Sequence, residues 1–221
     1  MGISPPTTSF HVKASLTPQT IQIESLITPA PHIYPMTERF ILGMTGATGQ
    51  LYGIRTLELL SNTDVEVHLV LSDASKINIQ QEADYSLSEV TGLADEVHDN
   101  RNIGATIASG SFHTNGMLVT PCSMKTLSNI ANGNSSNLIT RAADVILKER
   151  RRLVLMPREK PLNRIHLTNM LSVTDAGGVI YPPFPSFYQK PKDVDEMITR
   201  TMARALAYFD ISVSFDEWAG L

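Results

Sequence analysis

The segment Thr45–Gly49, with the sequence Thr-Gly-Ala-Thr-Gly, has the residue types of a phosphate-binding turn. It follows the apolar run Phe40–Met44 and precedes the amphipathic stretch 50–60, as expected of a turn between a strand and a helix. Backbone N–H groups at the helix start, together with the Thr48 hydroxyl, would hold the anion. We therefore predict a phosphate-binding turn, with an ordinary tight turn as the alternative.

Polar residues also follow three further apolar runs, each typical of a buried strand. In chain order they are Ser72, the group Ser123, Met124, Lys125 and Thr126, and the pair Arg158 and Glu159. The carboxyl ends of parallel strands lie at one edge of a sheet, and ligands bind there. We therefore expect all these residues to converge with the glycine-rich turn. Capping of the following helix is the alternative role for Ser123.

Arg141 and Lys148 belong to the one basic-rich region of the chain, residues 141–164. They are seven residues apart on the predicted helix 138–149, so they share a face two turns apart. A face that carries both cations beside a sheet edge suits an anion such as phosphate. The neighbouring Arg150–Arg152 are interpreted as a solvated helical face.

Three other residues are candidates for chemistry near these cations. Glu159 is a carboxylate among cations at a strand end, which suits either proton transfer near a departing phosphate or a salt-bridged loop. Arg204 lies among apolar residues of the predicted helix 194–209, where a buried guanidinium would need a phosphate or a carboxylate as partner. Tyr188 ends an aromatic and proline-rich loop, 181–188, that could line an apolar pocket.

Strands that alternate with helices predict an α/β fold, a Rossmann-like or flavodoxin-like parallel sheet between helices in a single domain, residues 38–211. Across 83–111 only short helical pieces are expected. Residues 1–37, rich in Ser, Thr and Pro, are interpreted as an extension that is flexible or packs on a neighbouring subunit, and 212–221 as a tail. The extension lacks the arginines of a typical mitochondrial presequence, so cytoplasmic and mitochondrial locations both stay open.

The composition argues against several classes of partner. A net charge of −4 and a pI near 5.8 provide no basic field for nucleic acid. No run of 18 apolar residues is present, so no membrane span is expected. The six histidines have no i,i+4 pair, so no metal is expected. The single cysteine, Cys122, excludes an internal disulfide and is interpreted as a buried filler.

A nicotinamide-dependent reductase is an alternative, because the same glycine-rich turn opens many dinucleotide-binding domains. Those domains have a third glycine three residues after the position of Gly49. Here Tyr52 occupies that position and Gly53 follows one residue late. Dinucleotide-binding domains also have an acidic residue at the end of the second strand, which binds the ribose. Here Ser72 occupies that place and the acidic Asp73 comes one residue later. These departures weaken the dinucleotide interpretation.

Taken together, the motifs resemble those of the UbiX-type flavin prenyltransferases. They are Gly-Ala-Thr-Gly, Pro-Cys-Ser-Met-Lys-Thr-Leu, Arg-Ala-Ala-Asp-Val-Ile-Leu-Lys-Glu-Arg-Arg, Leu-Val-Leu-Met-Pro-Arg-Glu and Pro-Ser-Phe-Tyr, in this order between Arg39 and Ile211. The resemblance implies a Rossmann-like homododecamer that transfers a dimethylallyl group from dimethylallyl phosphate to N5 and C6 of reduced FMN, without a metal. Some fungal members accept the diphosphate. The product, prenylated FMN, would serve a UbiD-type decarboxylase.

The resemblance also implies a role for each candidate residue. FMN would be bound by Gly46, Ala47, Thr48, Ser72, Ser123, Met124, Lys125, Thr126 and Arg158. The phosphate of the prenyl donor would be bound by Tyr188, Arg204, Arg141 and Lys148. Glu159 matches the catalytic glutamate, with Arg141 and Lys148 assisting the departure of phosphate. Trp218 could help to enclose the prenyl group.

Two other kinds of flavoprotein are alternatives. FMN-dependent cysteine decarboxylases usually have a histidine early in the chain and the motif Pro-x-Met-Asn-x-x-Met, where this chain has Pro-Cys-Ser-Met-Lys-Thr-Leu. A protein that only carries FMN would have no use for Glu159, Tyr188 and Arg204 around a second anion. Both comparisons favour prenyl transfer.

Overall fold

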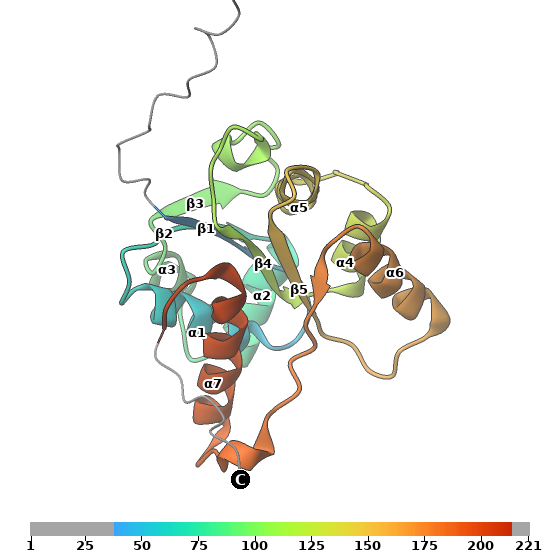
Figure 1. Ribbon diagram of the computed structural model, residues 1–221. Helices are drawn as coiled ribbons and strands as arrows, with labels where there is room; N and C mark the ends of the chain where they lie inside the picture. Colours follow the sequence, from blue (N-terminus) through green and yellow to red (C-terminus); the bar gives the residue numbers. More distant parts are fainter. Residues whose placement is uncertain (1–37, 214–221) are drawn as a thin grey trace, which may run out of the picture. The chain divides into compact units, whose positions relative to one another are not determined.

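The structure, a computed structural model, describes residues 38–213 and contains one parallel sheet of six strands (Figure 1). The strands are β1 (Arg39–Met44), β2 (Glu66–Leu71), β3 (Glu96–Asp99), β4 (Gly116–Cys122), β5 (Arg152–Pro157) and β6 (Val179–Ile180). Their order in the sheet is β3-β2-β1-β4-β5-β6. The chain adds β2 and β3 on one side of β1 and then β4, β5 and β6 on the other side. This is the order of a Rossmann-type sheet, so the predicted fold class is confirmed.

Helices cover both faces of the sheet, as two separate apolar cores show. They are α1 (Gln50–Leu60), α2 (Asp73–Glu82), α3 (Leu87–Thr91), α4 (Met124–Ala131), α5 (Leu138–Lys148), α6 (Arg164–Asp175) and α7 (Val194–Leu206). Side chains of α1, α2, α3 and α7 pack in one core, and those of α4, α5 and α6 in the other. Figure 1 shows α7 lying along α1. Short 3-10 turns η2 (Thr106–Ala108), η3 (Phe187–Gln189) and η4 (Ala207–Phe209) complete the described elements.

The central strands are apolar because both of their faces are covered. In β1, Phe40, Ile41 and Leu42 have no exposed surface, and β4 is buried along its whole length. A parallel strand with helices on both sides needs apolar residues at successive positions, since neither face meets water. The glycine-rich turn therefore starts from a rigid strand.

The strand β3 was not predicted. Residues 83–111, where only helical pieces were expected, contain α3, β3 and η2. Only His98 is buried among the four residues of β3, which lies at the edge of the sheet. The apolar run that marks a buried strand is therefore missing from its sequence. The other predicted elements are present, and their ends differ from the predicted ends by a few residues.

Part of the chain falls outside the structural description. The expectations for residues 1–37, for Trp218 and for most of the tail 212–221 concern residues that the structure does not describe. Between residues 38 and 213, none of the helices has the length and apolar character needed to cross a membrane.

Candidate active site

Thr45 joins the glycine-rich turn to the segment that follows β4. Its backbone N–H and its hydroxyl both donate to the carbonyl of Pro121, at 3.1 and 2.8 Å. The hydroxyl oxygen also accepts a hydrogen bond from the backbone N–H of Ser123 at 2.8 Å. Thr45 is 2% exposed, so these bonds are shielded from water. They confirm that the first and third polar segments meet at one edge of the sheet.

Gln50, the first residue of α1, stabilises the glycine-rich turn through its buried side chain. Its buried amide group donates to the carbonyls of Thr45 at 2.9 Å and Ala47 at 2.7 Å. Its amide oxygen accepts a hydrogen bond from the Ser75 hydroxyl at 2.6 Å. Ser75 lies in the first turn of α2, where Ser72 is the N-cap. The second polar segment therefore also lies beside the glycine-rich turn, as predicted.

A carboxylate already occupies the start of α1. Glu82, the last residue of α2, accepts hydrogen bonds at one oxygen from the backbone N–H groups of Gly49 at 2.7 Å and Gln50 at 3.1 Å. Gly49 is the N-cap of α1 and has a φ of 98°, which favours glycine. In this structure these two N–H groups are bonded to Glu82, so the predicted binding of phosphate at the helix start stays a prediction. Glu82 is 33 residues from Gly49, and no local pattern marks it in the sequence.

Arg158, directly after β5, brings a cation to the same turn. Its Nε donates to the carbonyl of Thr48 at 3.2 Å, and its backbone N–H donates to the carbonyl of Cys122 at 3.1 Å. Its guanidinium lies 5.8 Å from the centre of the Tyr52 ring. A cation and an aromatic face at this separation attract each other. Arg158 thus links the fourth polar segment to the first and third.

The residues at positions 52 and 53 explain the departure from the dinucleotide pattern. The Tyr52 ring supports Arg158, a contact that a glycine could not make. Gly53 allows α1 to approach β1 closely, because a Cβ at this position would lie 2.5 Å from the methyl carbon of Met44. The glycine that permits close packing is therefore present one residue later than in the dinucleotide pattern.

Ser123 is the N-cap of α4. Its hydroxyl oxygen accepts a hydrogen bond from the Thr126 N–H at 3.3 Å, and its hydroxyl donates to the Thr126 hydroxyl at 3.1 Å. The cap thus engages the Ser123 hydroxyl, whereas it does not use the hydrogen of the Thr126 hydroxyl. The N–H groups of Met124 and Lys125, the first two residues of α4, have no partner within the helix. They remain for a ligand.

The donor groups at this edge fit FMN. The hydrogen bonds of the described residues leave the backbone N–H groups of Gly46 and Thr48 unused, and both residues are exposed. With the N–H groups of Met124 and Lys125, they form two neighbouring sets of donors beside the guanidinium of Arg158. FMN has acceptors of the matching kind in its phosphate and along the polar edge of its ring system. The described residues can therefore hold this flavin, and the two segments that carry these donors, residues 45–49 and 122–125, are the candidate flavin-binding turns.

Glu159 and Arg141 lie at the carboxyl edge of the sheet, whereas Lys148 does not. Glu159 is exposed beside Arg158, and Arg141 is in the first half of α5 with an ion pair to Asp144 at 2.8 Å. Lys148 ends α5 and pairs with the neighbouring Glu149. A Cβ on Gly110, which precedes β4, would lie 2.9 Å from the Lys148 amino group. Lys148 therefore lies near the amino ends of the strands, away from the flavin-binding turns.

Arg204 is exposed, so the expectation of a buried guanidinium is wrong. It lines a hollow of about 390 Å³ together with Arg152, the first residue of β5, and Tyr208. Burial raises the pKa of Tyr181, and the positive charge of Arg204 opposes that rise. Tyr188 is 52% exposed and lies close enough to raise the pKa of Tyr181 further. Arg204 and Tyr188 are therefore both near Tyr181. Arg204, however, lies beside Arg152 at the amino end of β5.

Cys122 is a buried structural residue, as predicted. Its side chain has no exposed surface, and burial raises the pKa of its thiol to about 12. The thiol group therefore stays protonated at neutral pH and does not act as a nucleophile.

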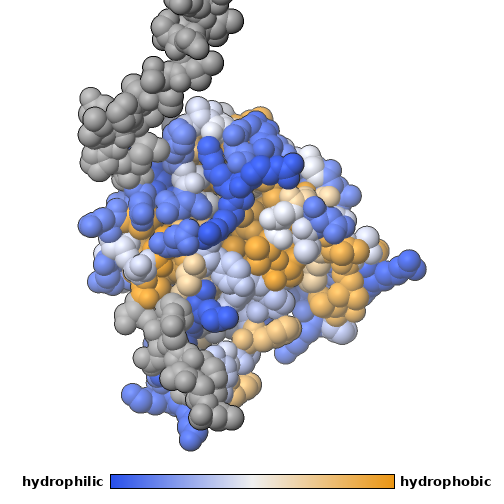
Figure 2. Space-filling view, viewed as in Figure 1, coloured by the Kyte–Doolittle hydropathy of each residue, from blue (hydrophilic) through white to orange (hydrophobic). Residues whose placement is uncertain are grey.

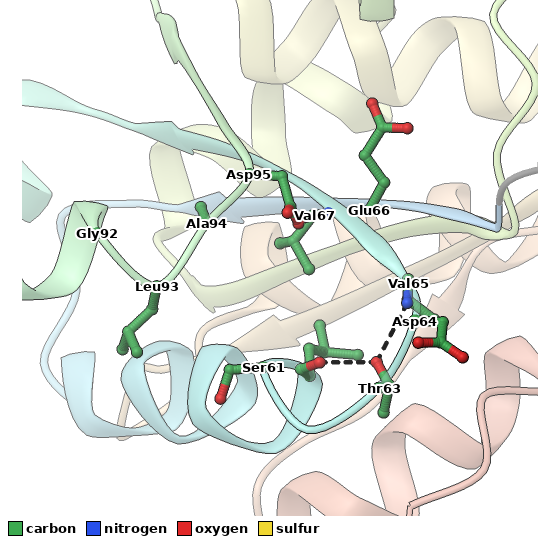
Figure 3. A pocket seen from close by; sticks show the side chains of 11 residues that line it. Ser61, Thr63, Asp64, Val65, Glu66, Val67, Gly92, Leu93, Ala94 and Asp95 are labelled. Carbon is green, nitrogen blue, oxygen red and sulfur yellow. Dashed lines mark hydrogen bonds between the residues drawn. The ribbon is translucent and has the colours of Figure 1, made fainter.

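A pocket of about 460 Å³ lies at the amino ends of the strands, whereas the flavin-binding turns lie at the carboxyl ends (Figure 3). It is lined by the turn before β2 and by the segment before β3, where the Asp95 carboxylate accepts a hydrogen bond from the Val67 N–H at 2.7 Å. Figure 3 shows the Glu66 side chain pointing away from that of Val67, toward the other face of the sheet. This pocket lies at the amino ends of β2 and β3 and shares no lining residue with the glycine-rich turn.

Comparison with known proteins shows which family the chain is similar to. The Flavoprotein family model matches residues 35–208. A flavin prenyltransferase UbiX from Neisseria meningitidis serogroup B is 52% identical over 84% of this chain and 99% of its own length. A crystal structure of AnUbiX in complex with FMN and dimethylallyl pyrophosphate is 48% identical, with a TM-score of 0.82, over 84% of this chain and 99% of that chain. A dodecameric FMN-dependent UbiX-like decarboxylase from Escherichia coli O157:H7 is 47% identical, with a TM-score of 0.80, over 82% of this chain and all of that chain.

The fold, the flavin-binding turns and these likenesses define the class of protein: the chain belongs to the flavoprotein family. Its relatives at about half identity place it among the UbiX flavin prenyltransferases, enzymes that transfer a prenyl group and bind FMN.

Proposed function

We propose that this protein transfers a dimethylallyl group from dimethylallyl phosphate to N5 and C6 of reduced FMN. The observation that carries the proposal is the set of open backbone donors at two adjacent turns, with Arg158 and the exposed Glu159 directly beside them. A site that only bound FMN would not need an exposed carboxylate there. The prenylated FMN would then be passed to a UbiD-type decarboxylase.

The flavin is held in this proposal by the residues at the carboxyl edge. Gly46, Ala47 and Thr48 contact it from the first turn, and Ser72 borders it from the start of α2. The segment Ser123–Thr126 contributes the N–H groups of its helix start. Arg158 adds charge opposite the polar edge of the flavin ring. Because the Thr45 and Gln50 hydrogen bonds fix both turns, these donors are oriented before the flavin arrives.

Glu159 acts as the proton acceptor in this proposal. When bound, reduced FMN supplies the nucleophilic nitrogen and the ring carbon that form the two new bonds. Bond formation at the ring carbon releases a proton, and the exposed Glu159 carboxylate can take it up. Arg158 is the neighbouring residue and keeps the flavin edge near this carboxylate.

Stabilisation of the departing phosphate is assigned to Arg141, Lys148, Tyr188 and Arg204. Removal of one such oriented donor typically costs about 2.7–4 kcal/mol of transition-state stabilisation. Lys148 and Arg204 lie near the amino ends of the strands, so one chain alone does not bring them to the flavin-binding turns. We therefore propose that neighbouring copies of the chain complete the site in a homo-oligomer, a dodecamer like the E. coli relative.

Exposed apolar side chains support this assembly. On α6, Ile165, Leu167 and Leu171 are between 54% and 69% exposed. Figure 2 shows apolar side chains gathered over this helix. Phe184 and Phe187, in the loop before α7, are 80% and 70% exposed. Burial of such residues against another copy would be favourable at about 25 cal/mol per Å².

The test is anaerobic incubation of the full chain with reduced FMN and dimethylallyl phosphate, followed by mass spectrometry of the released flavin. We expect a flavin that is heavier by one C5 unit. A parallel reaction with dimethylallyl diphosphate decides which donor this chain accepts. Recovery of unmodified FMN from protein that binds both substrates would refute the proposal.

Glu159→Gln isolates the proton-transfer step. FMN binding should be unchanged, and formation of the prenylated flavin should slow by about 10²–10⁴-fold. Glu38→Gln is the matched control, because Glu38 is an exposed carboxylate at the amino end of β1. Loss of FMN binding in Glu159→Gln would move Glu159 to a role in flavin binding. Transfer to a UbiD-type decarboxylase is tested by activation of that apoenzyme with the reaction product.

A further inference from the structure

Two buried histidines and two glutamates form a cluster on β2 and β3, on the face opposite α1. The parallel register places His68 beside Glu96, and His98 follows Glu96 by two residues on the same face. His68 is 1% and His98 8% exposed, whereas the Glu96 side chain is 51% exposed. The cluster is thus buried on one side and reachable from solvent past Glu96 at the edge of the sheet.

Potential metal-binding atoms of three residues converge in this cluster. His68 Nδ1 is 2.9 Å from His98 Nε2 and 3.4 Å from a carboxylate oxygen of Glu96. The three potential ligand atoms lie within 4.8 Å of one another. Two imidazoles and one carboxylate are a frequent ligand set for zinc and related divalent ions, with a fourth position left for water.

Each histidine also has a carboxylate at the nitrogen that faces away from the pair. His68 Nε2 is 2.9 Å from Glu66, and the other oxygen of Glu66 accepts a hydrogen bond from Arg39 Nε at 3.0 Å. His98 Nδ1 is 3.5 Å from the second oxygen of Glu96. Metal-binding histidines characteristically have such a carboxylate or carbonyl partner on the far nitrogen, which fixes the tautomer and the ring orientation.

We propose that His68, His98 and Glu96 form a binding site for a divalent transition-metal ion, with zinc as the best match. Glu66 and Arg39 are positioning residues for His68. The cation replaces the proton shared between His68 Nδ1 and His98 Nε2, and that proton moves to His98 Nδ1, which faces Glu96. Two carboxylates against one guanidinium leave a net negative charge that favours a cation.

The distance between the two histidine nitrogens changes little on binding. Two zinc–nitrogen bonds at a tetrahedral angle place their nitrogens about 3.3 Å apart. The His68 and His98 nitrogens, now 2.9 Å apart, must therefore separate by a few tenths of an ångström and the rings must turn toward the ion. His68 is held by Glu66 and by an edge-to-face contact with Phe112, whose ring centre lies 4.8 Å from that of His68. Most of this movement therefore falls to His98 on the edge strand.

The metal site is separate from the flavin site. His68 lies four residues before Ser72, about 13 Å along an extended strand. The proposed role of the ion is to tie the edge strand β3, which has little apolar surface of its own, to β2. Because no flavin-site residue is a ligand, prenyl transfer should be unaffected when a chelator removes the ion.

Zinc binding is tested on the full chain after treatment with a chelator and desalting. Calorimetric titration with zinc sulfate should show one equivalent per chain, and zinc should raise the Tm. Cobalt(II), used as a spectroscopic probe, should give the intense visible bands of a tetrahedral site with nitrogen and oxygen ligands. His98→Ala should lose at least 10-fold in affinity, and Glu66→Gln about 10–100-fold.

Two variants guard against misfolding and non-specific binding. Glu96→Gln removes an exposed ligand with little risk to the fold, and it should also weaken zinc binding and abolish the cobalt bands. His113→Ala, which changes an exposed histidine outside the cluster, should bind zinc like the unchanged chain. The proposal is overturned if the unchanged chain binds no more zinc than Glu96→Gln, or if His113→Ala lowers binding equally.

Discussion

The carboxylate of Glu82 caps the start of α1 by accepting hydrogen bonds from the backbone N–H groups of Gly49 at 2.7 Å and Gln50 at 3.1 Å. Gly49 has no side chain to serve as an N-cap. A residue from the end of α2 supplies the missing acceptor and places negative charge at the positive end of the helix dipole. The flavin-binding turn between β1 and α1 is therefore stabilised by a distant residue.

Glu82→Ala should destabilise the protein and weaken FMN binding. Loss of the cap leaves two N–H groups without a partner, at a cost of about 0.5–2 kcal/mol of the free energy of unfolding. A looser start of α1 also loosens the turn that precedes it. Thermal unfolding and fluorescence titration with FMN measure the two effects, with Glu38→Ala as control. Tighter binding of FMN or inorganic phosphate by Glu82→Ala would show instead that Glu82 blocks an anion site.

Thr45→Val should separate the two flavin-binding turns. Valine keeps the shape of threonine but leaves the partly buried N–H of Ser123 without its acceptor. An unsatisfied buried donor costs about 1–3 kcal/mol. We expect a lower Tm and weaker FMN binding than in the control Thr106→Val, where the side chain is exposed. Equal FMN affinity in both variants would show that the Thr45 contacts do not position the flavin donors.

The sequence was sufficient to predict the central part of the fold. The apolar runs of β1 and β4 and the amphipathic α1 are strong local signals, because central strands of a parallel sheet are buried on both faces. The convergence of the glycine-rich turn with Ser72 and Arg158 followed from the rule that parallel strands end at one edge.

What could not be predicted depends on contacts between distant segments. Glu82 meets Gly49 only in the folded chain, so no spacing reveals it. The pairing of His68 with His98 depends on β3, whose exposed residues hide it as a strand. Arg204 lies between apolar residues in the sequence, but the helical period places it on the exposed face of α7.

Cys122 should resist alkylation in the folded protein. Its thiol has no exposed surface and its pKa is raised from 9.0 to about 12 by burial, so almost no thiolate is present at pH 8. Iodoacetamide should label the chain only after denaturation, as measured by mass spectrometry. Since the folded-state pKa is the higher one, this group stabilises the fold below about pH 9 and the contribution is lost as the pH rises toward 12. Rapid labelling at pH 8 without denaturant would contradict the buried position.

Gly46→Ala should disrupt the flavin-binding turn, and Ala74→Gly in the same chain should restore it. A Cβ on Gly46 would lie 2.4 Å from the Cβ of Ala74 in α2, a contact that no pair of carbon atoms tolerates. Neither atom is at the end of a flexible side chain, so the turn or the helix must move. Overpacking of this kind typically costs about 1–3 kcal/mol.

The double variant Gly46→Ala/Ala74→Gly distinguishes the contact with Ala74 from a direct contact with the flavin. Removal of the Ala74 methyl group reopens the space, while a glycine within a helix costs only about 1 kcal/mol. Gly46 has no positive φ, so alanine fits its backbone once the contact is removed. FMN affinity should be strongly reduced in Gly46→Ala, near normal in Ala74→Gly and in the control Gly104→Ala, and largely recovered in the double variant. If the double variant binds FMN no better than Gly46→Ala, the alanine methyl group interferes with the flavin itself, and Gly46 is then required for ligand access to the turn.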